Sequence, residues 1–215
     1  KNRIVKVTNF SSKIWQLKNL PLAIMSWGNA KIGPRTVTSI VGQFDSCYKF
    51  ESSINVEKVA FNFKKFLIAI IKEYKVDVIG EVNFFIGGYS ADKYFSDQYK
   101  ISIPGGEVTK VFPCSNDPYD SQNYGVSWFG SSYPLARFIN GYDADQCNFL
   151  VSKGVSLDIV DEIKNSGILP FDFVFGSMSV QEAIDFANYC MQIVIGYNRF
   201  YGGLPYCGGD VDICV

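Results

Sequence analysis

The sequence contains no histidine. Ser-His-Asp and Cys-His nucleophile systems use imidazole as their base, so the sequence excludes both. Zinc sites with histidine ligands are excluded for the same reason. If the protein is a hydrolase, its base must be a carboxylate, a lysine or a free terminal amine.

Neither sign of charge is in excess, because 20 Lys and Arg residues stand against 21 Asp and Glu residues. Without a basic surplus to neutralise phosphates, we expect no nucleic-acid partner. The purest apolar run, residues 66–71, is far too short to span a bilayer. Residues 1–7 lack the apolar core of a signal peptide. These patterns predict a protein with no membrane partner.

The six cysteines are scattered and form no Cys-x-x-Cys pair. A chain of this length can bury about 70% of its surface on folding, so it needs no disulfides to be stable. We therefore favour free thiols in a reducing compartment over disulfides, and a cytoplasmic location. No glycine-rich stretch has the spacing of a phosphate-binding loop, so we expect no nucleotide site.

Hydrophobic residues make up 47% of the chain and charged residues 19%, which excludes intrinsic disorder. Residues 13–17 and 21–27 are two β-rich runs with a hairpin or tight connection between them. Pro34 suits the first position of a helix, because the N–H that proline lacks would be unpaired there. A long helix is predicted over residues 54–74, where an apolar stripe recurs at helical spacing.

Later segments continue the mixture of strands and helices. Strands are predicted where the hydrophobic period changes to two, over residues 82–87, 98–103, 109–112 and 124–129. Turns and loops are predicted at glycine pairs and in the polar run 115–123. Helices are predicted over 134–139 and parts of 143–165, and after the capping box of Ser179 and Glu182. A closing strand is predicted over 211–215. With no linker-like stretch, the order favours one layered α+β domain over residues 1–215.

Several short motifs occur in a fixed order over nearly the whole chain. They are Lys13-Ile14-Trp15-Gln16-Leu17, Met25-Ser26-Trp27-Gly28-Asn29-Ala30, the helix 54–74, Phe84-Phe85-Ile86-Gly87-Gly88-Tyr89, Gly130-Ser131-Ser132 with Gly141-Tyr142-Asp143, Met178-Ser179-Val180-Gln181-Glu182-Ala183 and Cys207-Gly208-Gly209-Asp210-Val211-Asp212-Ile213. Together they resemble the proteasome β-type subunits, their bacterial heat-shock peptidase relatives and the wider N-terminal-nucleophile hydrolases.

The resemblance implies a four-layer αββα sandwich and hydrolysis of a peptide or other amide bond without a metal or organic cofactor. The nucleophile in this family is the first residue of the mature chain, a Thr, Ser or Cys whose own α-amine serves as base. Lys13 matches the lysine whose charge lowers the proton affinity of the nucleophile. Gly28 matches the glycine whose N–H faces the oxyanion. Ser131 and Ser132 flank the position of a serine that helps to orient the amine, although they could equally cap a helix.

The chain also departs from the family pattern. Only twelve residues precede Lys13, and Lys1 cannot act as the nucleophile. We therefore expect either that the N-terminal strand or strands of the family are missing here, or that the chain is a non-catalytic subunit or assembly protein. The aspartate before the final glycine pair has no clear match, Asn198 being the nearest candidate. Cys207 stands where a serine is common, and a structural thiol is the favoured interpretation.

Aromatic residues make up 16% of the chain. Some of them fall in predicted loop tips, such as Tyr94-Phe95 and Phe200-Tyr201, where exposure would be costly in a monomer. We therefore expect self-association into rings or other homo-oligomers, as the family resemblance also implies. The aromatic content leaves open a third class, a carbohydrate- or ligand-binding β-rich module.

Overall fold

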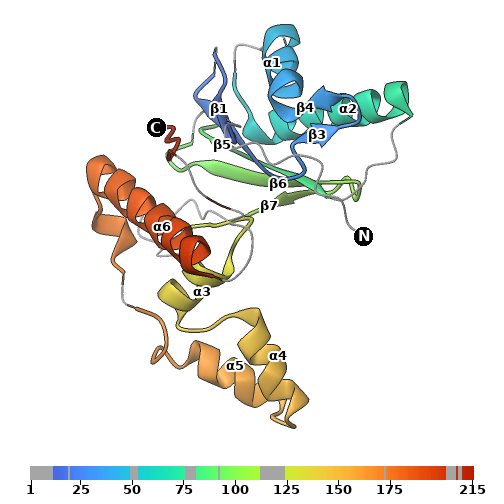
Figure 1. Ribbon diagram of the computed structural model, residues 1–215. Coiled ribbons are helices and arrows are strands. Elements are labelled where there is room, and N and C mark those ends of the chain that lie inside the picture. The colour runs from blue at the N-terminus through green and yellow to red at the C-terminus, as the bar shows by residue number, and fades with distance from the viewer. Residues whose placement is uncertain are drawn as a thin grey trace. The chain divides into compact units, whose positions relative to one another are not determined.

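The computed structural model describes residues 12–18, 20–48, 53–75, 81–91, 93–111, 124–171, 173–201, 207 and 210–215. The chain divides into two compact units, Lys1–Tyr124 with Asp212–Val215, and Gly125–Val211 (Figure 1). The single-domain interpretation stays a prediction. The described residues contain six α-helices and an antiparallel sheet, which confirms a mixed α+β protein. None of these helices is long and apolar enough to cross a membrane.

The first unit is built on one antiparallel sheet, whose described strands lie in the order β1-β2-β5-β6-β7. These are β1 (Ile14–Gln16), β2 (Leu22–Gly28), β5 (Val82–Gly88), β6 (Asp97–Ile103) and β7 (Val108–Lys110). The hairpin predicted at the start of the chain is confirmed, because β1 pairs with β2 and Trp15 lies opposite Ile24. The strands predicted near residues 82–87, 98–103 and 109–112 correspond to β5, β6 and β7, although Phe112 lies outside the described residues.

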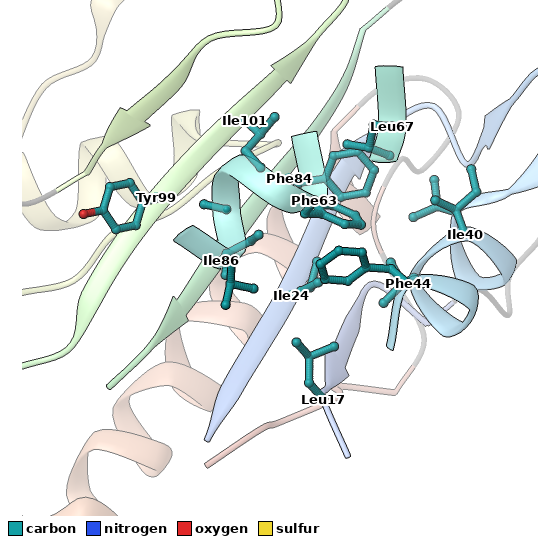
Figure 2. Packing of buried hydrophobic residues seen from close by; sticks show 14 of the residues in the cluster. Leu17, Ile24, Ile40, Phe44, Phe63, Leu67, Phe84, Ile86, Tyr99 and Ile101 are labelled. Atoms are coloured by element: carbon teal, nitrogen blue, oxygen red, sulfur yellow. The ribbon is translucent and has the colours of Figure 1, made fainter. Parts of the chain in front are cut away.

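Helices α1 (Val37–Cys47) and α2 (Val56–Tyr74) cover one face of this sheet (Figure 1). The predicted stripe of α2 is buried there, because its long apolar side chains pack on alternate residues of the strands. Figure 2 shows Phe63 of α2 between Phe44 of α1 and Phe84 of β5. The ring centres of Phe63 and Phe44 are 4.9 Å apart, and those of Phe63 and Phe84 are 5.0 Å apart.

The prediction that Pro34 opens a helix is wrong. Pro34 instead follows Gly33 in the turn between two short strands, β3 (Lys31–Ile32) and β4 (Arg35–Thr36). Gly33 has a φ of 58°, which suits a two-residue hairpin turn that needs a positive φ. The helix begins later, at Val37, where the Thr36 hydroxyl accepts a hydrogen bond from the Ser39 N–H at 3.2 Å.

A buried carboxylate fixes the loop between β5 and β6. The Ser90 hydroxyl donates to Asp97 Oδ2 at 2.6 Å, and the ammonium groups of Lys93 and Lys110 lie 2.9 and 3.5 Å from the same carboxylate. Ser90 also accepts a hydrogen bond from the Val56 N–H at 3.1 Å, which joins this loop to the start of α2. Burial alone would raise the pKa of Asp97, but the hydrogen bonds from Ser90 and Lys93 and the two lysine charges outweigh burial and lower it.

We expect Asp97→Asn to lower the free energy of unfolding at pH 7 by about 1.5–3 kcal/mol, because hydrogen bonds to a charged group are lost. The lowered pKa means that this stabilisation is complete above the ordinary value of 3.8 and is lost as the pH falls through the folded-state pKa. Urea unfolding of both proteins at pH 7 and pH 3 measures this. The difference between them should shrink at pH 3, and an equal difference at both pH values would contradict the ionised state of Asp97.

The second unit consists of helices that pack on a smaller core. They are α3 (Tyr133–Asn140), α4 (Ala144–Ser152), α5 (Leu157–Asn165), the 3-10 helix η2 (Phe175–Ser177) and α6 (Val180–Phe200). The core holds Leu135 and Ile139 of α3 against Cys190 and Val194 of α6. The predicted capping box at Ser179 is confirmed, because its hydroxyl accepts from the Glu182 N–H while the Glu182 carboxylate accepts from the Ser179 N–H.

Two predicted strands are wrong. Residues 124–129 and 211–215 are described, and neither segment pairs with another strand. Alternation of apolar and polar residues indicates one buried face, but a strand also needs a neighbour that pairs with its backbone. The polar run 115–123 and, apart from Cys207, the glycine-rich residues 202–209 lie outside the described residues.

Candidate functional site

Lys13 and Gly28 lie close together at one end of the β1–β2 hairpin. The Ser26 N–H donates to the Lys13 carbonyl at 2.8 Å, so the pairing of β1 with β2 continues to Lys13. Lys13 is therefore opposite Ser26, and Gly28 is two residues farther along β2. Residues in this diagonal relation have Cα atoms about 7–8 Å apart. Two residues that are fifteen positions apart in the sequence thus become neighbours through one local turn.

The Lys13 ammonium has no ion-pair partner among the residues that the structure describes. The residue as a whole is exposed, yet enough protein surrounds its amine to remove part of its hydration. This burial lowers the pKa of Lys13 from its ordinary value of 10.5. No carboxylate in the described part of the chain neutralises the Lys13 charge, so that charge can act electrostatically on a group placed beside it.

Gly28 ends β2 with a φ of 88°, a conformation that favours glycine. A Cβ at this position would clash with the carbonyl oxygen of Glu81, which already accepts the Asn29 N–H at 3.0 Å. In an antiparallel pair the N–H groups of alternate residues face the same neighbouring strand. Since the Ser26 N–H faces Lys13, the Gly28 N–H points to that same side of β2.

We expect Gly28→Ala to lower the free energy of unfolding by about 1–3 kcal/mol, because it combines a strained φ with a backbone clash. Urea unfolding followed by circular dichroism measures the change. Gly42→Ala in α1 is the matched control. A Cβ at Gly42 meets nothing within 4 Å, and alanine favours a helix, so this variant should gain about 0.5–1 kcal/mol. Equal effects of the two substitutions would contradict the described backbone at Gly28.

Ser131 lies in the second unit, and the site described here is built from the first unit alone. Ser131 is exposed and stands just before Ser132, the residue at the N-cap position of α3. The Ser132 side chain makes no capping hydrogen bond. Asn198 is buried in α6, where its side-chain amide donates to the Val194 carbonyl at 2.8 Å. Cys207 is half-buried and packs against the core of the second unit. These positions leave Lys13 and Gly28 as the two predicted site residues that the structure brings together.

The structure adds Ser12, next to Lys13, which the sequence interpretation did not include. The Ser12 hydroxyl donates to Asp212 Oδ2 at 3.4 Å and to the Ile14 carbonyl at 2.9 Å. The carboxylate of Asp212 thus approaches the segment that carries Lys13, across 200 positions of sequence. Asp212 belongs to the final motif of the resemblance, but nothing in the local pattern indicates which strand it meets.

Comparison with known proteins gives no family assignment. No protein-family model matches the chain. No curated protein matches it significantly either. The order of the short motifs and the geometry of Lys13 and Gly28 are therefore the observations that bear on function.

Proposed function

We propose that the chain forms the domain of a proteasome-like N-terminal-nucleophile hydrolase that cleaves a peptide or other amide bond. The observation that carries this proposal is the pairing of Lys13 with the strand that ends at Gly28. That pairing supports the proposal because Lys13, which has no ion-pair partner among the described residues, lies on the side of β2 to which the Gly28 N–H points. These are the two groups that such a reaction needs besides its nucleophile.

The proposed chemistry uses these two groups together with a terminal Thr, Ser or Cys as the nucleophile. The free α-amine takes the proton of the hydroxyl or thiol, which then attacks the amide carbonyl. The Lys13 charge favours the deprotonated nucleophile. The Gly28 N–H donates a hydrogen bond to the oxyanion that forms, and such a donor contributes about 10²–10³ to the rate. Collapse breaks the C–N bond, and the leaving amine takes the proton held by the terminal ammonium. Water then attacks the acyl enzyme, the α-amine taking its proton, and the terminal hydroxyl or thiol is regenerated as the acid leaves.

The proposal includes the four-layer sandwich, for which the sheet offers partial support. The face of the sheet opposite α1 and α2 carries Met25, Trp27 and Phe85, all of them half-buried. Met25 and Phe85 lie directly opposite one another on β2 and β5. A sheet with large apolar side chains on both faces needs cover on both, and a second sheet would provide it.

A second candidate is a non-catalytic subunit or assembly protein of the same fold. The observation that favours it is the exposure of aromatic residues at loop tips. Tyr94, in the loop after β5, is 94% exposed, and Phe200, at the end of α6, is 85% exposed. Large apolar side chains at such positions are typical of contact surfaces, and homo-oligomeric rings are the assembly that we propose.

The decisive experiment uses the complete protein and an electrophile that captures hydroxyl or thiol groups. We expect a single label at the terminal residue, detected by peptide mass spectrometry, together with hydrolysis of a fluorogenic peptide amide. Acetylating the terminal amine should abolish both, because no histidine can replace it as the base. Hydrolysis that persists after acetylation would reject the mechanism. Absence of both label and turnover would favour the non-catalytic candidate.

A further inference from the structure

Two buried polar atoms on the β1–β2 hairpin have no hydrogen-bond partner among the residues that the structure describes. They are the indole nitrogen of Trp15 and the hydroxyl oxygen of Ser26. Ser26 is only 4% exposed, so bulk water does not reach its side chain. Buried N–H and O–H groups are almost always paired in native proteins, because losing their hydration without a replacement is costly. Each atom therefore requires an explanation.

The register of the hairpin places both side chains together. Trp15 lies opposite Ile24, and Ser26 follows two residues later on β2, on the same face of the sheet. That face is the one that α1 and α2 cover, and Trp15 packs against its core. The two residues are therefore diagonal neighbours, a separation that long side chains can reach across. The two side chains do not bond to each other, so a group that satisfies both atoms must bridge them.

We infer that one buried water molecule binds between the Trp15 indole N–H and the Ser26 hydroxyl. The indole can only donate, so the bridging group must accept a hydrogen bond. Water accepts from Trp15 and can donate to, or accept from, Ser26. Ile24 and Phe84, the neighbours of this pair on β2 and β5, are fully buried and apolar. Lys13 lies directly opposite Ser26 on β1, so an anion is the competing occupant that the test must distinguish from water.

The bound water would join β1 to β2 through the side chains of Trp15 and Ser26. Ser26 lies opposite Lys13 and two residues before Gly28. The water would therefore help to keep the two strands in the register that sets Lys13 and Gly28 beside each other. The inference does not depend on the proposed function, because it concerns the hairpin whether or not the protein is an enzyme.

The test is a double-mutant cycle of thermal unfolding with Ser26→Ala, Trp15→Phe and the double variant. If a water bridges the two side chains, Ser26→Ala lowers Tm by about 2–4 °C in the Trp15 protein and by much less in the Trp15→Phe protein. If both atoms are unpaired, Ser26→Ala leaves Tm unchanged or raises it, and the two substitutions are additive. That second result would overturn the inference. Ser102→Ala on β6 controls for loss of a serine from a strand.

A second measurement uses the unaltered protein and so does not depend on how the variants fold. We expect an NMR cross-peak between the Trp15 indole N–H and a slowly exchanging water, assigned by its loss in Trp15→Phe. Absence of the cross-peak would overturn the inference. A rise in Tm with sodium acetate that Ser26→Ala abolishes would also overturn it, by showing that the site takes a carboxylate instead of water.

Discussion

Lys13→Met in the complete protein is expected to lower kcat for amide hydrolysis by at least about 100-fold, with little change in the fold. Methionine keeps most of the apolar stem of the lysine and removes only its charge. The charge acts at close range on the proposed nucleophile, as oxyanion donors do, and losing one such group typically costs 10²–10³ in rate. An exposed lysine, by contrast, usually contributes less than about 0.5 kcal/mol to stability. Steady-state kinetics and urea unfolding of the same preparations separate the two effects.

Lys18→Met is the matched control, because Lys18 is an exposed lysine on the same hairpin. It should retain full activity. Since burial lowers the pKa of Lys13, the rate of the unaltered protein should begin to fall at a pH below the ordinary lysine value of 10.5. A Lys13→Met protein with full activity would reject the electrostatic role of Lys13 and leave the rest of the hairpin description intact.

The elements with strong periodicity were predictable from sequence. The helix predicted over 54–74 spans Val56–Tyr74 in the structure, so its start differs by only two residues. It was predictable because one unbroken apolar stripe packs on β5 and β6. The Asn55 side chain accepts the Lys58 N–H at 2.9 Å and fixes that start. The hairpin of β1 and β2 was equally predictable, since its strands are adjacent in sequence and its turn is short.

The errors occur where a local pattern competes with contacts that it does not encode. The glycine before Pro34 favours a hairpin turn, and this outweighed the helix-start preference of the proline. Residues 124–129 and 211–215 alternate like strands but have no partner strand. An apolar face can be buried against a helix or a loop as well as within a sheet. Pairing is a property of two segments, and a single segment cannot indicate it.

The same distinction applies to the candidate site. Lys13 and Gly28 could be predicted as neighbours because a single hairpin joins them. The approach of Asp212 to Ser12 could not be predicted, because it spans 200 positions and depends on how the last residues fold back. Trp15 and Ser26 gave no sequence signal either, since an alternating strand pattern does not say which polar atoms are left without partners.

Phe63→Ala is expected to lower the free energy of unfolding of the first unit by about 3–5 kcal/mol. Phe63 is fully buried, and its ring meets those of Phe44 and Phe84 edge-on, so truncation removes apolar burial and leaves a cavity. Phe61→Ala is the matched control on the same helix. Phe61 is 42% exposed, and its loss should cost about 1 kcal/mol or less. Urea unfolding followed by circular dichroism measures both variants.

The Phe63 result also tests how the core supports the candidate site. Phe84 lies opposite Ser26 on the neighbouring strand, so the cavity would open directly beneath β2, two residues before Gly28. We expect Phe63→Ala protein, assayed where it is still folded, to lose amide hydrolysis more than Phe61→Ala does, because strand β2 loses its support. Equal stabilities of the two variants would contradict the packing of α2 on the sheet. Equal activities with unequal stabilities would show that the hairpin holds its geometry without this part of the core.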